Sequence, residues 1–275
     1  MSWPYTASFA MFAELEGKYF AYVDTFRVGG GLPEMMELKL LHTRSVVSAA
    51  RMIAEGEGFG NRTACALEAA ALLHDTGRYE QLKRFNTFRD ADSVDHAVFS
   101  HDIVKEKGWL DGWEDASAIL TAVLVHNRRD IPAAEMDDLT LDCSRALRDA
   151  DKLDIFNVLE DRVSNTDWRR DSRAFWNLET HRAPSAEVVE ALLEERTVDY
   201  QHIKCLADFV MVQVGWMISG LEYATSCRIC LERGHLGFRR RFLGELTDDP
   251  VVDVVCAKAE AALKKRLTER EDVLV

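Results

Sequence analysis

Apolar residues recur along this chain at the three- and four-residue spacing of helices, and no stretch alternates apolar and polar positions as a strand does. The most apolar windows are rich in alanine, leucine and valine, and cover residues 65–74, 116–126 and 209–221. Amphipathic patterns surround them, and a charged helical pattern closes the chain over 251–267. The sequence therefore predicts an all-α protein.

The same pattern predicts three parts. Residues 1–34 form an aromatic-rich, helical N-terminal extension whose glycines at 29–31 make a turn, because no strand precedes them as a phosphate-binding loop requires. Residues 35–165 alternate apolar helices with polar loops and form the central domain. Residues 166–275 have a more charged texture, and we expect them to form a helical part that packs on that core.

Local signals refine the central domain. A helix beginning after Pro33 is expected to bury Leu38, Leu41 and Val46 on one face, together with His42. Asn61 or Thr63 is expected to cap the helix that ends at His74, and Ser93 the helix that carries His96.

Composition excludes several classes of protein. The chain has 275 residues, 47% of them hydrophobic, and a formal charge of −13, which disfavours stable nucleic-acid binding. Residues 1–5 begin no secretory signal, and the 209–221 window is interrupted by Gln213 and too short to span a bilayer. We expect a cytoplasmic protein without membrane contact. Its six cysteines are expected to be reduced thiols, mostly in the core, including the Cys227 and Cys230 pair.

Polar side chains recur at the ends of the apolar helices. Histidine and aspartate stand together at His74 and Asp75, and further such residues occur at His42, His96, His126 and Asp151. Burying an imidazole or a carboxylate without a partner costs about 1 to 3 kcal/mol or more, so a compensating group is expected. Nitrogen and oxygen ligands suit Mn, Fe, Co, Ni, Zn or Mg. The sequence thus predicts a site for one or two divalent ions.

The order His42, His74-Asp75, Asp151 resembles the H…HD…D signature of the HD superfamily of metal-dependent phosphohydrolases, and the resemblance covers roughly residues 35–165. It implies an HD-domain helical bundle with additional C-terminal helices. It also implies that His42, His74, Asp75 and Asp151 hold one ion. In dinuclear members two further histidines bind a second ion, bridged by the aspartate of the pair; His96 and His126 match them.

The resemblance implies a phosphomonoesterase or phosphodiesterase that attacks a small phosphorylated substrate, commonly a nucleotide, with metal-activated water. Asp75 and Arg78 would be catalytic, with Asp75 accepting a proton and Arg78 holding a phosphate oxygen, assisted by Lys152. Asn127 stands where the signalling phosphodiesterase branch has a second histidine, and Arg78 stands where the deoxynucleotidase branch has glutamate. Both of those activities are therefore disfavoured.

Two other functions remain open at this point. Four histidines and two aspartates also resemble the ligand set of diiron oxygenases that share the HD fold. A non-catalytic, ligand-binding HD protein is the third interpretation. The apolar helices beyond residue 185 could serve a homodimer interface as well as a second core layer.

Overall fold

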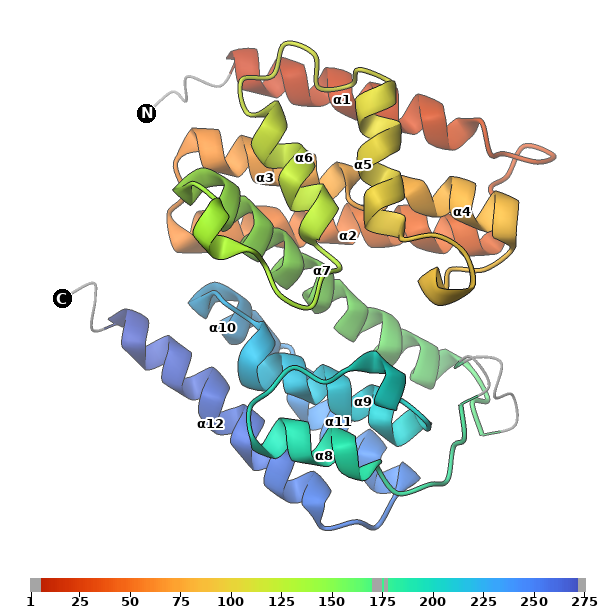
Figure 1. Cartoon of the computed structure of the whole chain (residues 1–275), viewed down its shortest axis with the longest axis vertical. Helices are drawn as coiled ribbons and strands as arrows, with labels where there is room; N and C mark the ends of the chain where they lie inside the picture. Colours follow the sequence, from red (N-terminus) through yellow and green to blue (C-terminus); the bar gives the residue numbers. More distant parts are fainter. Residues whose placement is uncertain (1–5, 170–174, 176–177, 272–275) are drawn as a thin grey trace. The chain divides into compact units, whose positions relative to one another are not determined.

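The computed structural model describes residues 6–169, 175 and 178–271, so residues 1–5 of the predicted N-terminal extension lie outside the described part (Figure 1). In the described ranges the chain forms helices and no β-strand; its extended pairing is limited to isolated bridges at Val28–Gly31 and Glu179–Cys205. The predicted all-α class is confirmed.

The chain divides into two compact units, Met1–Asp151 and Lys152–Val275. The division falls inside one long helix, α7 (Asp138–Asn165), whereas the sequence placed the edge of the central domain at residue 165. Every residue expected to bind metal lies in the first unit, with Asp151 as its last residue.

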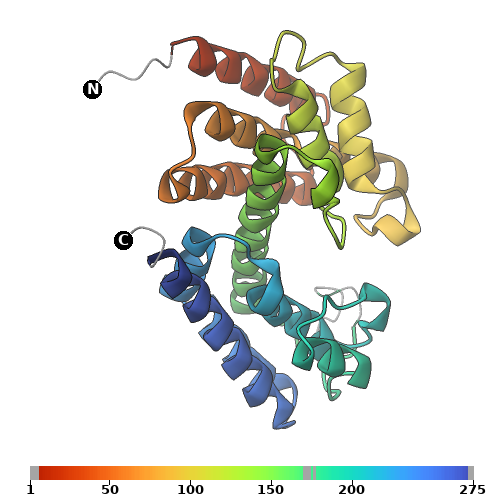
Figure 2. The ribbon, with the colours of Figure 1, turned by 60° about the vertical axis from the view of Figure 1, so that its left-hand side comes forward.

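The first unit contains α1 (Thr6–Asp24), α2 (Glu34–Glu57), α3 (Asn61–Leu73), α4 (Gly77–Phe85), α5 (His96–Glu106), α6 (Ala116–Val125) and the start of α7. Helix α3 packs against α1, α2 and α6, and α5 packs against α4 and α6 (Figure 2). The alanine-rich run at 69–71 is fully buried in α3. Small side chains there let the neighbouring helices approach closely.

The buried side of α2 differs from the predicted one. Met36, Leu40, His42 and Val46 are buried, whereas Leu41 is 53% exposed. The buried side of α2 carries Leu40 and Val47, because α3 and α4 pack against that side. The prediction for His42 and Val46 is right, and that for Leu41 is wrong.

Two predicted helix caps are also wrong. Asp95, rather than Ser93, caps α5: its Oδ1 accepts hydrogen bonds from the backbone N–H groups of Ala97 (2.9 Å) and Val98 (3.3 Å). Helix α3 starts with Gly60 at the cap position and has no side-chain cap bond.

The second unit contains the rest of α7, then α8 (Ala186–Leu193), α9 (Leu206–Gly215), α10 (Ala224–Glu232), α11 (His235–Leu246) and α12 (Val251–Glu271). The predicted apolar helix over 209–221 is α9 continued by a π-helical turn, Trp216–Gly220. Helix α12 packs against α8, α9, α10 and α11. All six cysteines are free thiols, and Cys227 and Cys230 are buried in α10. Among the described helices, none is both long and apolar enough to cross a membrane.

Candidate metal centre

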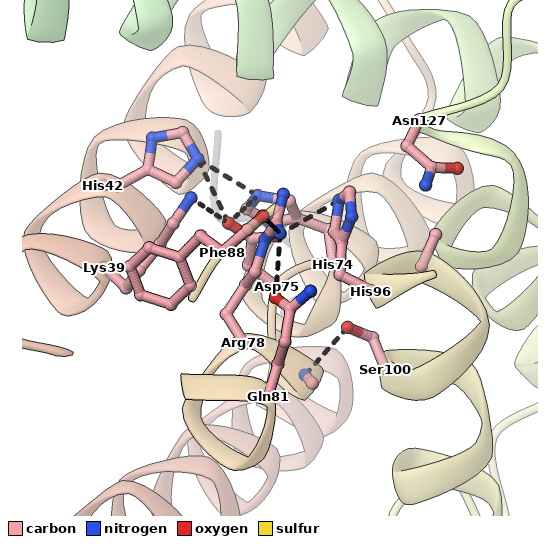
Figure 3. Close-up of polar contacts among 12 residues, drawn as sticks. Lys39, His42, His74, Asp75, Arg78, Gln81, Phe88, His96, Ser100 and Asn127 are labelled. Carbon is pink, nitrogen blue, oxygen red and sulfur yellow. Dashed lines mark hydrogen bonds and ion pairs between the residues drawn. The ribbon is translucent and has the colours of Figure 1, made fainter. Parts of the chain in front are cut away.

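Five helices bring the predicted ligands of the first unit together. His42 lies in the middle of α2, His74 ends α3, His96 begins α5, His126 ends α6, and Asp151 lies on α7. Asp75 follows His74 in the tight turn between α3 and α4. Figure 3 shows His42, His74 and His96 converging on Asp75.

The first group of donors surrounds one oxygen of Asp75. The Nε2 atoms of His42 and His74 lie 3.3 Å apart, and each is 3.6 Å from Asp75 Oδ2. Asp151 Oδ1 lies 3.1 Å from His42 Nε2 and 3.9 Å from His74 Nε2. Each of the two imidazole nitrogens thus lies within 3.9 Å of a carboxylate oxygen from Asp75 and of one from Asp151.

The second group faces the other oxygen of Asp75. His96 Nε2 lies 3.7 Å from Asp75 Oδ1 and 3.0 Å from His126 Nε2. The ligand atoms of Asp75, His96 and His126 lie within 4.8 Å of one another, as do those of His42, His74 and Asp75. Asp75 therefore belongs to two groups, with one oxygen directed to each.

Hydrogen bonds at the opposite ring nitrogens settle which histidine nitrogens carry lone pairs. His74 Nδ1 is 2.8 Å from the carbonyl oxygen of Ala71, and His126 Nδ1 is 2.7 Å from that of Val123. A carbonyl only accepts, so both Nδ1 atoms donate and both Nε2 atoms present lone pairs. His96 Nδ1 contacts Asp90 Oδ2 at 2.5 Å and donates in the same way. Lone pairs directed into a shared space fit a bound cation.

The protonation states also suit a metal. Burial lowers the pKa of His74, and it lowers the pKa values of His96 and His126 to about 4, so these imidazoles are neutral at pH 7. Burial raises the pKa of Asp75, but Lys39 and the neighbouring cations outweigh it and hold that pKa well below its usual value. Contacts with His42 likewise outweigh burial at Asp151 and lower its pKa. Neutral imidazoles and ionised carboxylates are the forms that bind metals.

Lys39 is a site residue that the sequence analysis missed. Its Nζ donates to Asp75 Oδ2 at 2.7 Å, and the ammonium lies 5.6 Å from the centre of the Phe88 ring (Figure 3). Lys39 precedes His42 by three residues, so the two share a side of α2. That offset was the available signal, although it does not distinguish a site lysine from a solvated one.

Arg78 lies beside the same carboxylate. Its Nη1 donates to Gln81 Oε1, the Phe88 carbonyl and Asp90 Oδ1, at 2.7–2.9 Å. Its Nε lies 3.4 Å from Asp75 Oδ1 and has no hydrogen-bond partner.

Two other polar residues each have a partner that is not a member of these donor groups. Lys152 Nζ donates to the Gly220 carbonyl oxygen at 2.8 Å within the second unit. His101, five residues after His96 on α5, pairs with the exposed Asp102 at 2.8 Å.

The family comparison matches this arrangement. The model of the HD domain family matches residues 40–155, a range that contains all six predicted ligands. Residues 40–155 therefore form an HD domain, a domain typical of metal-dependent phosphohydrolases. No curated protein and no solved structure matches the chain significantly.

Proposed function

We propose that this protein is a phosphohydrolase that uses two divalent ions to cleave a small phosphorylated substrate, with nucleotides the first class to test. The observation that carries the proposal is the position of Asp75: Oδ2 faces His42 and His74, and Oδ1 faces His96. A carboxylate with one oxygen toward each of two nitrogen groups is suited to bridge two ions. His42, His74 and Asp151 would complete one site, and His96 and His126 the other.

Bound divalent ions would supply a hydroxide nucleophile at neutral pH and polarise the phosphoryl group. The chain's own residues position the reactants. The unpartnered Nε–H of Arg78 is a buried donor beside Asp75, and we assign it to a phosphoryl oxygen. Asp75, ionised at neutral pH, is the acceptor for the proton of the attacking water. Lys152 remains a second predicted phosphate contact.

The charge around Asp75 favours an anionic substrate. The cations of Lys39 and Arg78 lie within 3.4 Å of its two oxygens, in a site where His74, His96 and His126 are neutral. When ions satisfy the Asp75 carboxylate, these two cations become available to compensate a phosphate charge.

The test is phosphate release by metal-stripped protein reloaded with Mn, Fe, Co, Ni, Zn or Mg. We expect turnover of at least one nucleotide or small phosphoester, and a loss of at least about 100-fold in Asp75→Ala. Asp130→Ala, at an exposed carboxylate, is the control and should keep full activity.

The other two interpretations give distinct results when the metal content of the protein as purified and its oxygen consumption are measured alongside phosphate release. The donor set of four histidines and two aspartates also suits iron. Two equivalents of iron with oxygen consumption and no phosphate release would replace the hydrolase proposal by an oxygenase. No bound metal and no turnover of any phosphoester would indicate a ligand-binding protein.

A further inference from the structure

One ligand histidine is held differently from its neighbours. His74 and His126 donate their Nδ1–H groups to backbone carbonyls three residues earlier, inside their own helices. His96 begins α5 and has no preceding helical turn, and its Nδ1 instead contacts Asp90 Oδ2 at 2.5 Å. The orientation of His96 therefore depends on a side chain from the segment before its helix.

Asp90 is itself fixed through its other oxygen. Oδ1 accepts from Arg78 Nη1 at 2.9 Å and from Gln81 Nε2 at 3.0 Å, and both donors belong to α4. Gln81, which is fully buried, also donates to Ser93 Oγ and to the Val94 carbonyl. The segment 88–94 is thus tied to α4, with Asp90 as the link between α4 and His96.

We propose that Asp90 is a positioning residue for the second ion, acting through His96. Its carboxylate holds the hydrogen on Nδ1, keeps the lone pair on Nε2, and makes the imidazole more basic. The inference rests on the proposed function only in requiring that the chain binds two ions. It goes further because it makes binding of the second ion depend on the segment 88–94.

No histidine of the first donor group is held by Asp90. His42 and Asp151 lie within α2 and α7, and His74 is oriented by its own helix, whereas Asp75 is shared by both groups. A change at Asp90 should therefore weaken binding of the second ion selectively. Loss of a residue that only stabilised the fold would weaken binding of both ions alike.

Asp90→Asn gives a sharp test because each of the two terminal atoms of this side chain has a defined partner. Arg78 and Gln81 both donate to the Oδ1 position, so the new amide oxygen stays with them and the new NH₂ turns toward His96 Nδ1. That NH₂ donates, which drives the hydrogen of His96 to Nε2, the atom that must bind metal. We expect the apparent Kd of the second ion to rise about 10- to 100-fold.

The measurement is calorimetric titration of metal-stripped protein with Mn²⁺, without substrate. Wild type should bind two ions, and D90N should keep the first Kd within about twofold while the second weakens. The matched control is Asp102→Asn, because Asp102 pairs with the non-ligand His101 on the same helix at 2.8 Å. It should leave both ions unchanged.

Three results would overturn the inference: wild type binding one ion, D90N retaining both affinities, or D90N weakening both equally. If D90N loses its helical circular dichroism, Asp90→Glu replaces it, since it keeps the charge but displaces the carboxylate; the same selective weakening is expected. Absence of phosphate release by a protein that binds two ions would contradict the proposed function and leave this inference standing.

Discussion

The Nε2 atoms of His96 and His126 lie 3.0 Å apart with their lone pairs facing each other, because the Nδ1 of each ring donates to another acceptor. Two facing lone pairs repel unless a cation lies between them. Burial in addition lowers the pKa values of both rings to about 4, so neither ring relieves the repulsion by binding a proton at pH 7. The metal-free protein therefore keeps an unfavourable contact that metal would remove.

The metal-free protein should lose stability between pH 6.5 and pH 4. In that window the unfolded chain binds protons at histidines whose folded pKa values are lowered, so unfolding takes up protons. The free energy of unfolding then falls as pH falls; a histidine whose pKa is one pH unit lower in the folded protein contributes about 1.4 kcal/mol to that fall. Urea unfolding in EDTA measures it. The assignment would be contradicted if the free energy of unfolding did not change across this window. It would also be contradicted if that free energy fell by the same amount in the double variant His96→Ala/His126→Ala as in the wild type.

Lys39→Met should destabilise the metal-free protein by about 3 kcal/mol, because it leaves the buried Asp75 carboxylate without its ammonium partner. With saturating metal the loss should shrink, since a bound cation satisfies the same oxygen. Urea unfolding with and without Mn²⁺ measures both values. Lys18→Met, which breaks the surface pair with Glu14, should cost at most about 1 kcal/mol in either condition. A Lys39→Met loss that metal does not reduce would show that Lys39 acts elsewhere.

Gly77→Ala should disturb the approach of α4 to α5. A Cβ at Gly77 would lie 2.7 Å from the backbone nitrogen of Ser100 and 3.0 Å from the His96 carbonyl oxygen. Because both neighbours are backbone atoms, α5 must shift, at a cost of about 1–3 kcal/mol and with weaker binding of the second ion.

Gly244→Ala is the control for this change, since nothing lies within 4 Å of its added Cβ inside α11. It should stabilise the protein by about 0.5–1 kcal/mol. Thermal unfolding measures the stability of both variants, and Mn²⁺ titration measures their affinity for the second ion. Equal changes in the two variants would refute the close contact at Gly77.

The second unit depends on a fully buried arginine. Arg239 donates to Glu160 at 2.8 Å, to Gln213 at 2.8 and 3.0 Å, and to two backbone carbonyls. Arg239→Met should cost about 3–5 kcal/mol because it removes the guanidinium that pairs with Glu160 and that donates to the buried Gln213. Adding Glu160→Gln should recover part of that loss. Strictly additive losses in urea unfolding would show that the pair is not coupled.

The helices and the ligand set follow from sequence because both depend on local signals. Apolar spacing predicts the helices. Polar residues that end apolar helices, as at His74 and His126, destabilise the fold when buried unless a partner compensates them. The order of the motif then identified the family. In the structure His74 and His126 lie at the ends of α3 and α6, and their role as metal ligands stays a prediction.

The supporting residues could not be derived in this way. Lys39 has the pattern of any lysine on an amphipathic helix, and its partner is 36 residues away. Asp90 acts from an irregular segment whose path depends on Arg78 and Gln81. The exposed Leu41 shows the same limit, because which side of α2 is buried depends on how α3 and α4 pack against it.

The central claim is that Asp75 bridges two ions, and an electron paramagnetic resonance titration with Mn²⁺ tests it most directly. The account predicts two ions per chain whose spins couple through the shared carboxylate, and loss of the coupled signal in Asp75→Ala. A single ion per chain, or two ions with independent spectra, would contradict it.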